Sequence, residues 1–297
     1  MNVLNEGYKN TKYLFKRGYG STILDKNNQK FLDLTSAGGT SLLGHNNSVF
    51  INSVKKFINN KYSNFALPNA HAINFSYNLR KIFPQFTKFI FCNSGAEANM
   101  KAIRIARAVT KKDKIINISG SWHGSIDQFL FSINSQGKKI SLSSGLEKKI
   151  EDKIIYAPYN DFQKTKKIIN KHKKETCCVI IEPIQGCLPS NENTNYLSLL
   201  SNFCKKKNII LILDEIITGL RTDCSSVQNK YALHSDISTF GKVFGNGLPI
   251  GFIGVSKKIE KKINKNKNKI FFGGTFSGNS FSTYVANETL KFLVKNK

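Results

Sequence analysis

The sequence predicts an α/β fold: a mainly parallel sheet of about seven strands with helices on both faces, and a short β-hairpin segment at the N-terminus. One observation is that short apolar runs rich in β-branched residues alternate with segments long enough to form crossover helices. The other is that polar residues follow several of these runs directly, as is typical of the carboxyl edge of a parallel sheet.

Each element follows from a local pattern. The hairpin is predicted at residues 20–34, where two apolar segments flank the turn-forming residues 25–28. Crossover helices are predicted within residues 97–110 and 194–207, and a last helix begins at residue 287. The candidate strands are residues 89–92, 115–118, 153–157, 178–181, 209–213, 236–240 and 251–255.

Composition limits the function classes. The 297 residues are 40% hydrophobic and 22% charged, and no run reaches the ~18 apolar residues of a membrane span. The first residues lack a signal-peptide pattern, so we expect a cytoplasmic protein. The net charge of +26 comes from lysines spread along the whole chain, which indicates compositional drift and predicts no specific nucleic-acid binding.

The six cysteines predict structural thiols. No pair has the CxxC spacing of a zinc or redox site, so no metal site is expected. Cys92 and Cys178 lie in apolar strands and Cys177 lies beside one, which fits buried thiols in a reducing compartment.

A lysine and an aspartate follow two successive candidate strands. Asp214 ends the strand at 209–213, and Lys242 follows the strand at 236–240. Pyridoxal phosphate requires such a pair, because a lysine forms a Schiff base with its aldehyde and a carboxylate keeps its ring nitrogen protonated. We therefore interpret them as a catalytic pair. A structural ion pair between Asp214 and an arginine is the alternative.

Two turns are candidates for holding a phosphate. Ser94, Gly95 and Ala96 join a strand to a helix, and Ser94 and Glu97 have the spacing of a capping box. Small residues at a helix N-terminus leave backbone amides free for an anion, although many helices begin in this way. The second turn is rich in glycine and hydroxyl groups and could bind phosphate through Thr275, but flexible loops share this composition.

Four further residues could contact a planar cofactor. Trp122 could stack on its ring with His123 beside it, and Ile217 is placed to pack on the opposite ring face. Glu182, at the end of a strand, could hydrogen-bond near a ring substituent. The alternatives are a buried aromatic at Trp122, a satisfied core histidine at His123 and an exposed carboxylate at Glu182.

These motifs, in this order, resemble those of the class III, fold type I, pyridoxal phosphate-dependent aminotransferases. Within that family the likeness is greatest to the aminomutases of glutamate 1-semialdehyde. The resemblance implies amino-group transfer on small amino and keto substrates. It extends from about residue 12 to the last residue, with matching stretches at residues 93–98, 104–107, 122–124, 214–221, 241–251 and 274–279.

The resemblance also implies roles for individual residues. Lys242 would be the Schiff-base lysine and Asp214 the partner of the pyridine nitrogen. The turn at residues 94–96 would hold the phosphate, and Trp122 would stack on the ring. Thr275 would reach the phosphate of a neighbouring subunit, so a homodimer with shared active sites is part of the expectation.

The family pattern further divides the chain. We expect an N-terminal arm and hairpin over residues 1–45 and a large cofactor-binding domain over residues 46–286. Residues 287–297 would begin the connection to a C-terminal small domain that the sequence does not include. The sequence leaves open whether the chain is such an aminomutase, an intermolecular transaminase acting on an ω-amino acid, diamine or amino sugar, or a truncated, inactive cofactor-binding remnant.

Overall fold

The computed structural model describes residue 5 and residues 11–134, 136–190 and 193–296. The predictions made for residues 1–4 and 6–10 of the N-terminal arm, and for Lys297, lie outside this part of the chain. Within it, no helix is both long enough and apolar enough to cross a membrane.

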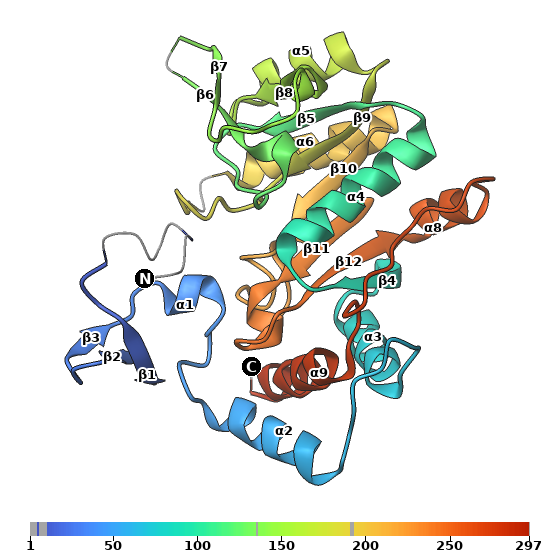
Figure 1. Ribbon diagram of the computed structural model, residues 1–297. Helices are drawn as coiled ribbons and strands as arrows, with labels where there is room; N and C mark the ends of the chain where they lie inside the picture. Colours follow the sequence, from blue (N-terminus) through green and yellow to red (C-terminus); the bar gives the residue numbers. More distant parts are fainter. Residues whose placement is uncertain (1–4, 6–10, 135, 191–192, 297) are drawn as a thin grey trace.

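The central sheet has seven strands in the order β4-β12-β11-β10-β9-β5-β8 (Figure 1). β12 runs antiparallel to both of its neighbours, and the other six strands share one direction. The predicted α/β class is confirmed, and every predicted strand is present with its ends shifted by at most three residues. The strands are β4 (Phe86–Cys92), β5 (Lys114–Ile118), β8 (Ile154–Ala157), β9 (Thr176–Ile181), β10 (Ile210–Asp214), β11 (Ile237–Gly241) and β12 (Gly251–Ser256).

Helices cover both faces of this sheet because its strands are apolar on both sides. In β9, Ile180 belongs to the core layer beneath α4, and the next residue, Ile181, belongs to the layer beneath α6. Figure 1 shows α4 lying across one face of the sheet. The covering helices are α4 (Gly95–Thr110) and α8 (Lys257–Asn264) on one face, and α5 (Phe162–His172) and α6 (Thr194–Lys207) on the other.

A phenylalanine-rich cluster fills the core at the β4 end of the sheet. Phe240 of β11 and Phe252 of β12 are fully buried and stack with their ring centroids 5.0 Å apart, and Phe75 and Phe244 pack on them. The elements of this layer are α2 (Ser48–Asn59), α3 (Ala70–Ile82), η4 (Lys242–Gly245) and α9 (Ser280–Lys295). α9 begins before the predicted residue 287 because the side chain of Asn279 accepts a hydrogen bond from the backbone N–H of Ser282 and caps the helix.

The predicted N-terminal hairpin is present and gains a third strand, so that a small antiparallel sheet stands beside the main body (Figure 1). An isolated bridge between Gly20 and His45 ties it to the chain that leads into α2. The strands are β1 (Phe15–Tyr19), β2 (Thr22–Asp25) and β3 (Lys30–Leu32). The remaining short elements are α1 (Ser36–Gly39), η2 (Asp127–Phe129), β6 (Phe131–Ile133), β7 (Lys139–Ser141), η3 (Ile150–Lys153) and α7 (Val227–Lys230).

Candidate active site

The polar residues singled out in the sequence lie at one edge of the central sheet. β4, β5, β9, β10 and β11 run in the same direction, so their carboxyl ends meet at this edge. Asp214 is the last residue of β10, and the segments that follow β4, β5, β9 and β11 carry Ser94, Trp122, Glu182 and Lys242 respectively.

Asp214 is a buried carboxylate with one acceptor position to spare. Its Oδ2 accepts hydrogen bonds from Asn99 Nδ2 at 2.8 Å and from His123 Nδ1 at 2.7 Å. Its Oδ1 accepts one from the backbone N–H of Ile216 at 3.1 Å. A carboxylate offers about four acceptor positions, so Oδ1 can take a further donor. In the described part of the chain no arginine pairs with Asp214, which excludes the structural ion pair considered as an alternative.

His123 and Asn99 position this carboxylate. His123 is buried, and its Nε2 lies 3.2 Å from Asn117 Oδ1, so it is a satisfied buried histidine that contacts Asp214. Asn99 Oδ1 accepts a hydrogen bond from Thr239 Oγ1 at 2.8 Å. The sequence interpretation missed Asn99. Its signal was an amide among the mostly apolar buried residues of α4.

Lys242 has a strained backbone and a half-buried amine. Its φ of 46° lies in the left-handed region, which costs a non-glycine residue roughly 1–2 kcal/mol and is typical of functional positions. Burial lowers the pKa of the amine, the charges of Asp214 and Glu182 act in the opposite direction, and that of Arg221 lowers it further. A lower pKa increases the fraction of neutral amine, which is the form that acts as nucleophile or base.

The turn before α4 is shaped as an anion site. Ser94 Oγ accepts a hydrogen bond from the backbone N–H of Glu97 at 3.1 Å, which caps the helix. Glu97 returns a contact to the N–H of Asn93, one residue before the usual capping-box position. The N–H groups of Gly95 and Ala96 have no acceptor within the helix. They are therefore available to a phosphate.

A glycine of β12 allows the strand to pass this turn. A Cβ on Gly251 would lie 2.1 Å from the carbonyl oxygen of Ser94, so no larger residue fits without moving the turn. The anion-binding turn therefore packs directly against β12, the strand that follows Lys242 in the sequence.

A hydrogen bond connects Glu182, which follows β9, with Trp122, which follows β5. Glu182 is buried, and its Oε2 accepts a hydrogen bond from the backbone N–H of Trp122 at 2.8 Å. The alternative of an exposed carboxylate is therefore wrong. Trp122 is 50% exposed, so a buried aromatic is also excluded and its side chain has accessible surface that could cover a ligand. Burial, and next the charge of Asp214, raise the pKa of Glu182 to about 7.

Replacing Glu182 by glutamine should change how stability depends on pH. Because the pKa is 4.5 in the unfolded chain and about 7 in the folded protein, the folded protein binds more protons between these values and loses stability as the pH rises through them. Glu182→Gln lacks the titrating group and should not show this loss. The difference in the free energy of unfolding between the variant and wild type should therefore shift in favour of the variant by up to about 3 kcal/mol between pH 5 and pH 8. Urea unfolding of the cofactor-free proteins measures this difference. Parallel pH curves would contradict it, since other titrating groups are common to both proteins.

Two isoleucines after β10 point in different directions. A Cβ on Gly95 would lie 2.6 Å from Ile216 Cδ1, and one on Gly241 would lie 3.7 Å from Ile216 Cγ2. Ile216 therefore lies between the anion-binding turn and the residue before Lys242. Ile217 Cδ1 instead lies against Gly186. The structure thus puts Ile216, rather than Ile217, in the position from which it could pack on a ring held there.

Thr275 lies in another part of the molecule's surface. It lines a cavity of about 700 Å³ formed by α3, β4 and the segments around residues 65–69 and 274–278. Among the described residues, neither Asp214 nor Lys242 lines this cavity. Thr275 therefore does not share this cavity with Asp214 and Lys242 of the same chain.

Comparisons with known proteins agree with this geometry. The family model described as aminotransferase class-III matches residues 3–297. The chain is 36% identical over 292 residues to the glutamate-1-semialdehyde 2,1-aminomutase of Wigglesworthia glossinidia brevipalpis, covering 96% of this chain and 66% of that protein. The chain belongs to the class III aminotransferases.

Solved structures with the same fold include two that are described as transaminases. An ω-transaminase from Sphaerobacter thermophilus aligns with a TM-score of 0.85 and 27% identity, over 95% of this chain and 66% of that one. A structure described as a transaminase with PLP bound aligns with a TM-score of 0.85 and 23% identity, over 96% and 68% of the two chains, and shows the fold alone. The chain spans about two thirds of the length of the curated relatives it matches.

Proposed function

We propose that this chain binds pyridoxal phosphate and transfers amino groups between small amino and keto compounds. The observation that carries the proposal is the pairing of a half-buried lysine amine with a buried carboxylate at the ends of the adjacent parallel strands β10 and β11. Membership of the class III aminotransferases supports it. The six free thiols fit a reducing compartment, and we place the protein in the cytoplasm.

The residues of the site fit this cofactor. The free acceptor position on Asp214 Oδ1 suits a protonated ring nitrogen, and the amides of Gly95 and Ala96 suit a phosphate. The exposed face of Trp122 and the side chain of Ile216 supply apolar surface for an aromatic ring.

When bound, pyridoxal phosphate supplies an electron sink that stabilises negative charge on a substrate carbon. The protein supplies the rest. Asp214, held by Asn99 and His123, would favour a positive charge on the ring nitrogen, because that charge would offset the cost of burying the carboxylate. Lys242 would take up and return a proton at its Nζ, and burial favours the neutral form that accepts it by lowering the pKa of the amine.

We infer that the reaction is that of a glutamate-1-semialdehyde 2,1-aminomutase, which is supported by curated relatives that are up to 36% identical. An intermolecular transaminase is the second candidate, supported by the likeness to the ω-transaminase of Sphaerobacter thermophilus. An aminomutase returns the amino group to another carbon of the same molecule and needs no separate keto acceptor. The test is to supply glutamate 1-semialdehyde to the cofactor-loaded protein without such an acceptor and to follow the position of the amino group.

Three outcomes separate the candidates. Movement of the amino group without an acceptor supports the aminomutase. Transfer that requires an added keto acid supports the intermolecular transaminase. A protein that forms a borohydride-reducible adduct with pyridoxal phosphate but transfers nothing under either condition would be an inactive cofactor binder.

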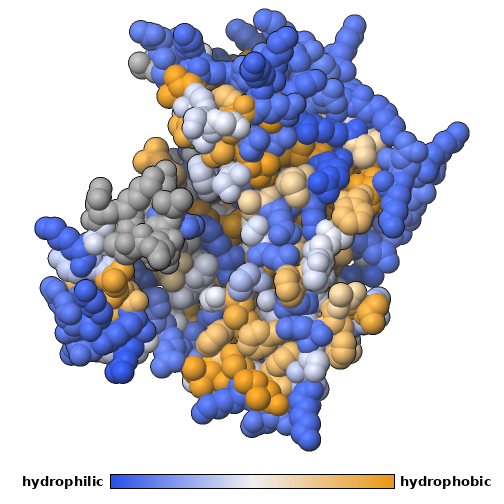
Figure 2. Space-filling model, in the orientation of Figure 1, coloured by the Kyte–Doolittle hydropathy of each residue, from blue (hydrophilic) through white to orange (hydrophobic). Residues whose placement is uncertain are grey.

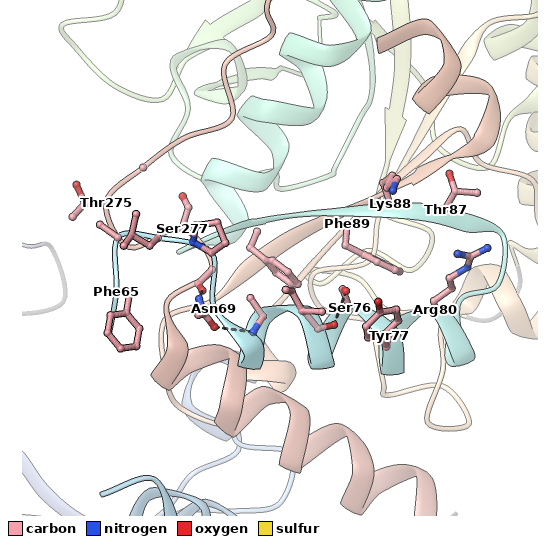
Figure 3. Close-up of a pocket in the computed structure, with 18 residues that line it drawn as sticks. Phe65, Asn69, Ser76, Tyr77, Arg80, Thr87, Lys88, Phe89, Thr275 and Ser277 are labelled. Atoms are coloured by element: carbon pink, nitrogen blue, oxygen red, sulfur yellow. Dashed lines mark hydrogen bonds between the residues drawn. The ribbon is translucent and has the colours of Figure 1, made fainter. Parts of the chain in front are cut away.

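We also propose that two copies of the chain form a dimer through the surface around Thr275. Several large apolar side chains are exposed there, and contiguous exposed apolar surface is typical of protein–protein interaction sites. Figure 3 shows Thr275 near Phe65 at one end of the cavity and Arg80 at the other, with Tyr77 between them. Figure 2 shows apolar surface over the lower part of the molecule, where α2, α3 and α9 lie. The exposed side chains are Phe65, Leu67, Ile73, Tyr77, Phe271 and Phe276.

Mixing two inactive variants tests whether the copies share their active sites. Lys242→Ala removes the lysine, and Thr275→Asp places a negative charge where the phosphate of the partner's cofactor is expected. If Thr275 serves the partner, a mixed dimer contains one site with both native residues, and mixing should restore cofactor binding to up to about a quarter of wild type under random pairing. If Thr275 serves its own chain, mixing restores nothing. Borohydride-reducible cofactor measures the result, and light scattering checks the dimer.

A further inference from the structure

Arg221 lies beside the catalytic lysine and has no acidic partner. It follows the turn after β10, and its Nη2 donates a hydrogen bond to the carbonyl oxygen of Gly39 at 2.9 Å. Its charge is close enough to Lys242 to lower the pKa of that amine. In the described part of the chain no Asp or Glu forms an ion pair with it.

A rigid loop from the N-terminal segment brings Gly39 to this position. Asp33 Oδ1 accepts hydrogen bonds from the N–H and hydroxyl of Thr35, and its Oδ2 accepts one from the N–H of Ala37. His45 Nε2 lies 2.8 Å from the same Oδ2. The bond from the Thr35 hydroxyl is the largest of the effects that lower the pKa of Asp33, so the carboxylate stays ionised and the loop stays anchored.

Gly39 leaves a space between the two cations. A Cβ added to it would lie 3.5 Å from Arg221 Nη2 and 3.9 Å from Lys242 Nζ. A methyl group would therefore occupy the space between the guanidinium and the amine. The φ of 87° at Gly39 also favours glycine, because other residues rarely adopt it.

Of the two basic groups, Arg221 and Lys242, Arg221 is the one that stays charged at all relevant pH values. A guanidinium does not lose its proton in proteins, whereas burial lowers the pKa of the Lys242 amine. A guanidinium has five N–H donors, of which one is given to Gly39. The remaining donors have the fork geometry that binds a carboxylate through both oxygens. In this sequence only five of the 45 basic residues are arginine, so an arginine here is not simply part of the lysine-rich surface.

We propose that Arg221, held by Gly39, binds the carboxylate of the substrate and thereby selects amino acids and keto acids over diamines and simple amines. The inference rests on the proposed function, because it concerns the substrate of the same site. A diamine would bring a second ammonium group toward Arg221 and Lys242, and like charges repel in a partly buried site. A carboxylate placed there would instead be attracted by both.

The test compares butyrate with its uncharged analogue butyramide. Each is titrated by ligand-detected NMR against the full chain loaded with pyridoxal phosphate and against the cofactor-free chain. Arg221→Gln should weaken butyrate binding by about tenfold or more, the loss expected for a charge-assisted contact, and should leave butyramide binding unchanged. Arg221→Lys should recover part of the butyrate affinity. Arg107→Gln is the matched control, since Arg107 also donates to a backbone carbonyl, that of Asp113.

The outcomes separate this inference from the proposed function. Equal losses for butyrate and butyramide would mean that Arg221 only anchors the loop, and unchanged or undetectable butyrate binding would place the carboxylate elsewhere. Each of these results overturns the inference. A wild-type chain that takes up no pyridoxal phosphate would contradict the proposed function, and the titration of the cofactor-free chain would still decide the role of Arg221.

Discussion

Replacement of Lys242 by alanine is expected to abolish amino-group transfer, with a loss of roughly 10⁴-fold or more. General acid–base transfer alone contributes about 10²–10⁴-fold, and in the proposed function this lysine would also supply the nucleophile that holds the cofactor covalently. The half-buried amine with a lowered pKa is suited to both tasks. Borohydride reduction followed by peptide mass spectrometry should find the cofactor on Lys242 in wild type and nowhere in the variant.

Lys257→Ala is the control for this experiment. Lys257 lies on α8 with an exposed side chain that pairs with Glu260, so its loss should change neither the adduct nor the activity. If Lys242→Ala retains a reducible adduct at another lysine together with activity, the assignment of the catalytic lysine is wrong.

Asp214→Asn is expected to lower kcat/KM by roughly 10²–10³-fold, the size of effect seen when one preorganised charged or polar group is removed from an active site. The amide keeps the size of the side chain but loses the charge that would hold a proton on the ring nitrogen. It also places an NH₂ group where Asn99 and His123 now donate, so cofactor affinity should fall as well. The measurements are kcat/KM and the dissociation constant of pyridoxal phosphate.

The neighbouring Glu215 provides a matched control. It is a buried carboxylate that accepts hydrogen bonds from Thr218 and from the backbone N–H groups of Val227 and Gln228, and burial raises its pKa to about 7. At pH 5, where the raised pKa gives wild type no disadvantage, Glu215→Gln should lower the free energy of unfolding by about 1–3 kcal/mol, because the amide turns an NH₂ group toward one of these donors. It should leave cofactor binding unchanged. Activity of Asp214→Asn within about threefold of wild type would remove Asp214 from the mechanism.

The sequence predicted the central sheet well because its strands are buried on both faces. Residues 178–181 and 209–213 are continuous apolar runs, and such runs are recognisable without knowledge of the fold. β1 was missed because its sequence, FKRGY, belongs to a small exposed sheet and carries two charges. α8 was missed because its KKIEKKIN pattern has few apolar residues, although Ile259 and Ile263 pack on the core.

For the site, the sequence identified residue types and strand ends but not side-chain directions. The path of the chain after β10 decides that Ile216 and not Ile217 lies beside Gly95. The role of His123 depends on Asp214, which is 91 residues away in sequence. Gly39 and Arg221 meet only because the loop at residues 33–39 folds back over the sheet edge, and no local pattern encodes that contact.

The reversed strand β12 determines when this site can form during synthesis. β4 leads into the anion-binding turn, but its neighbour in the sheet is β12, and Cys92 pairs with Gly251. A ribosome that has released only the first half of the chain has therefore made the turn without the strand that fixes it. Pairings this distant in sequence form late and slowly. The nascent chain must keep β4, with its apolar residues and open edge, from other partners until β12 emerges, and this interval is when it is most exposed to aggregation and most dependent on chaperones.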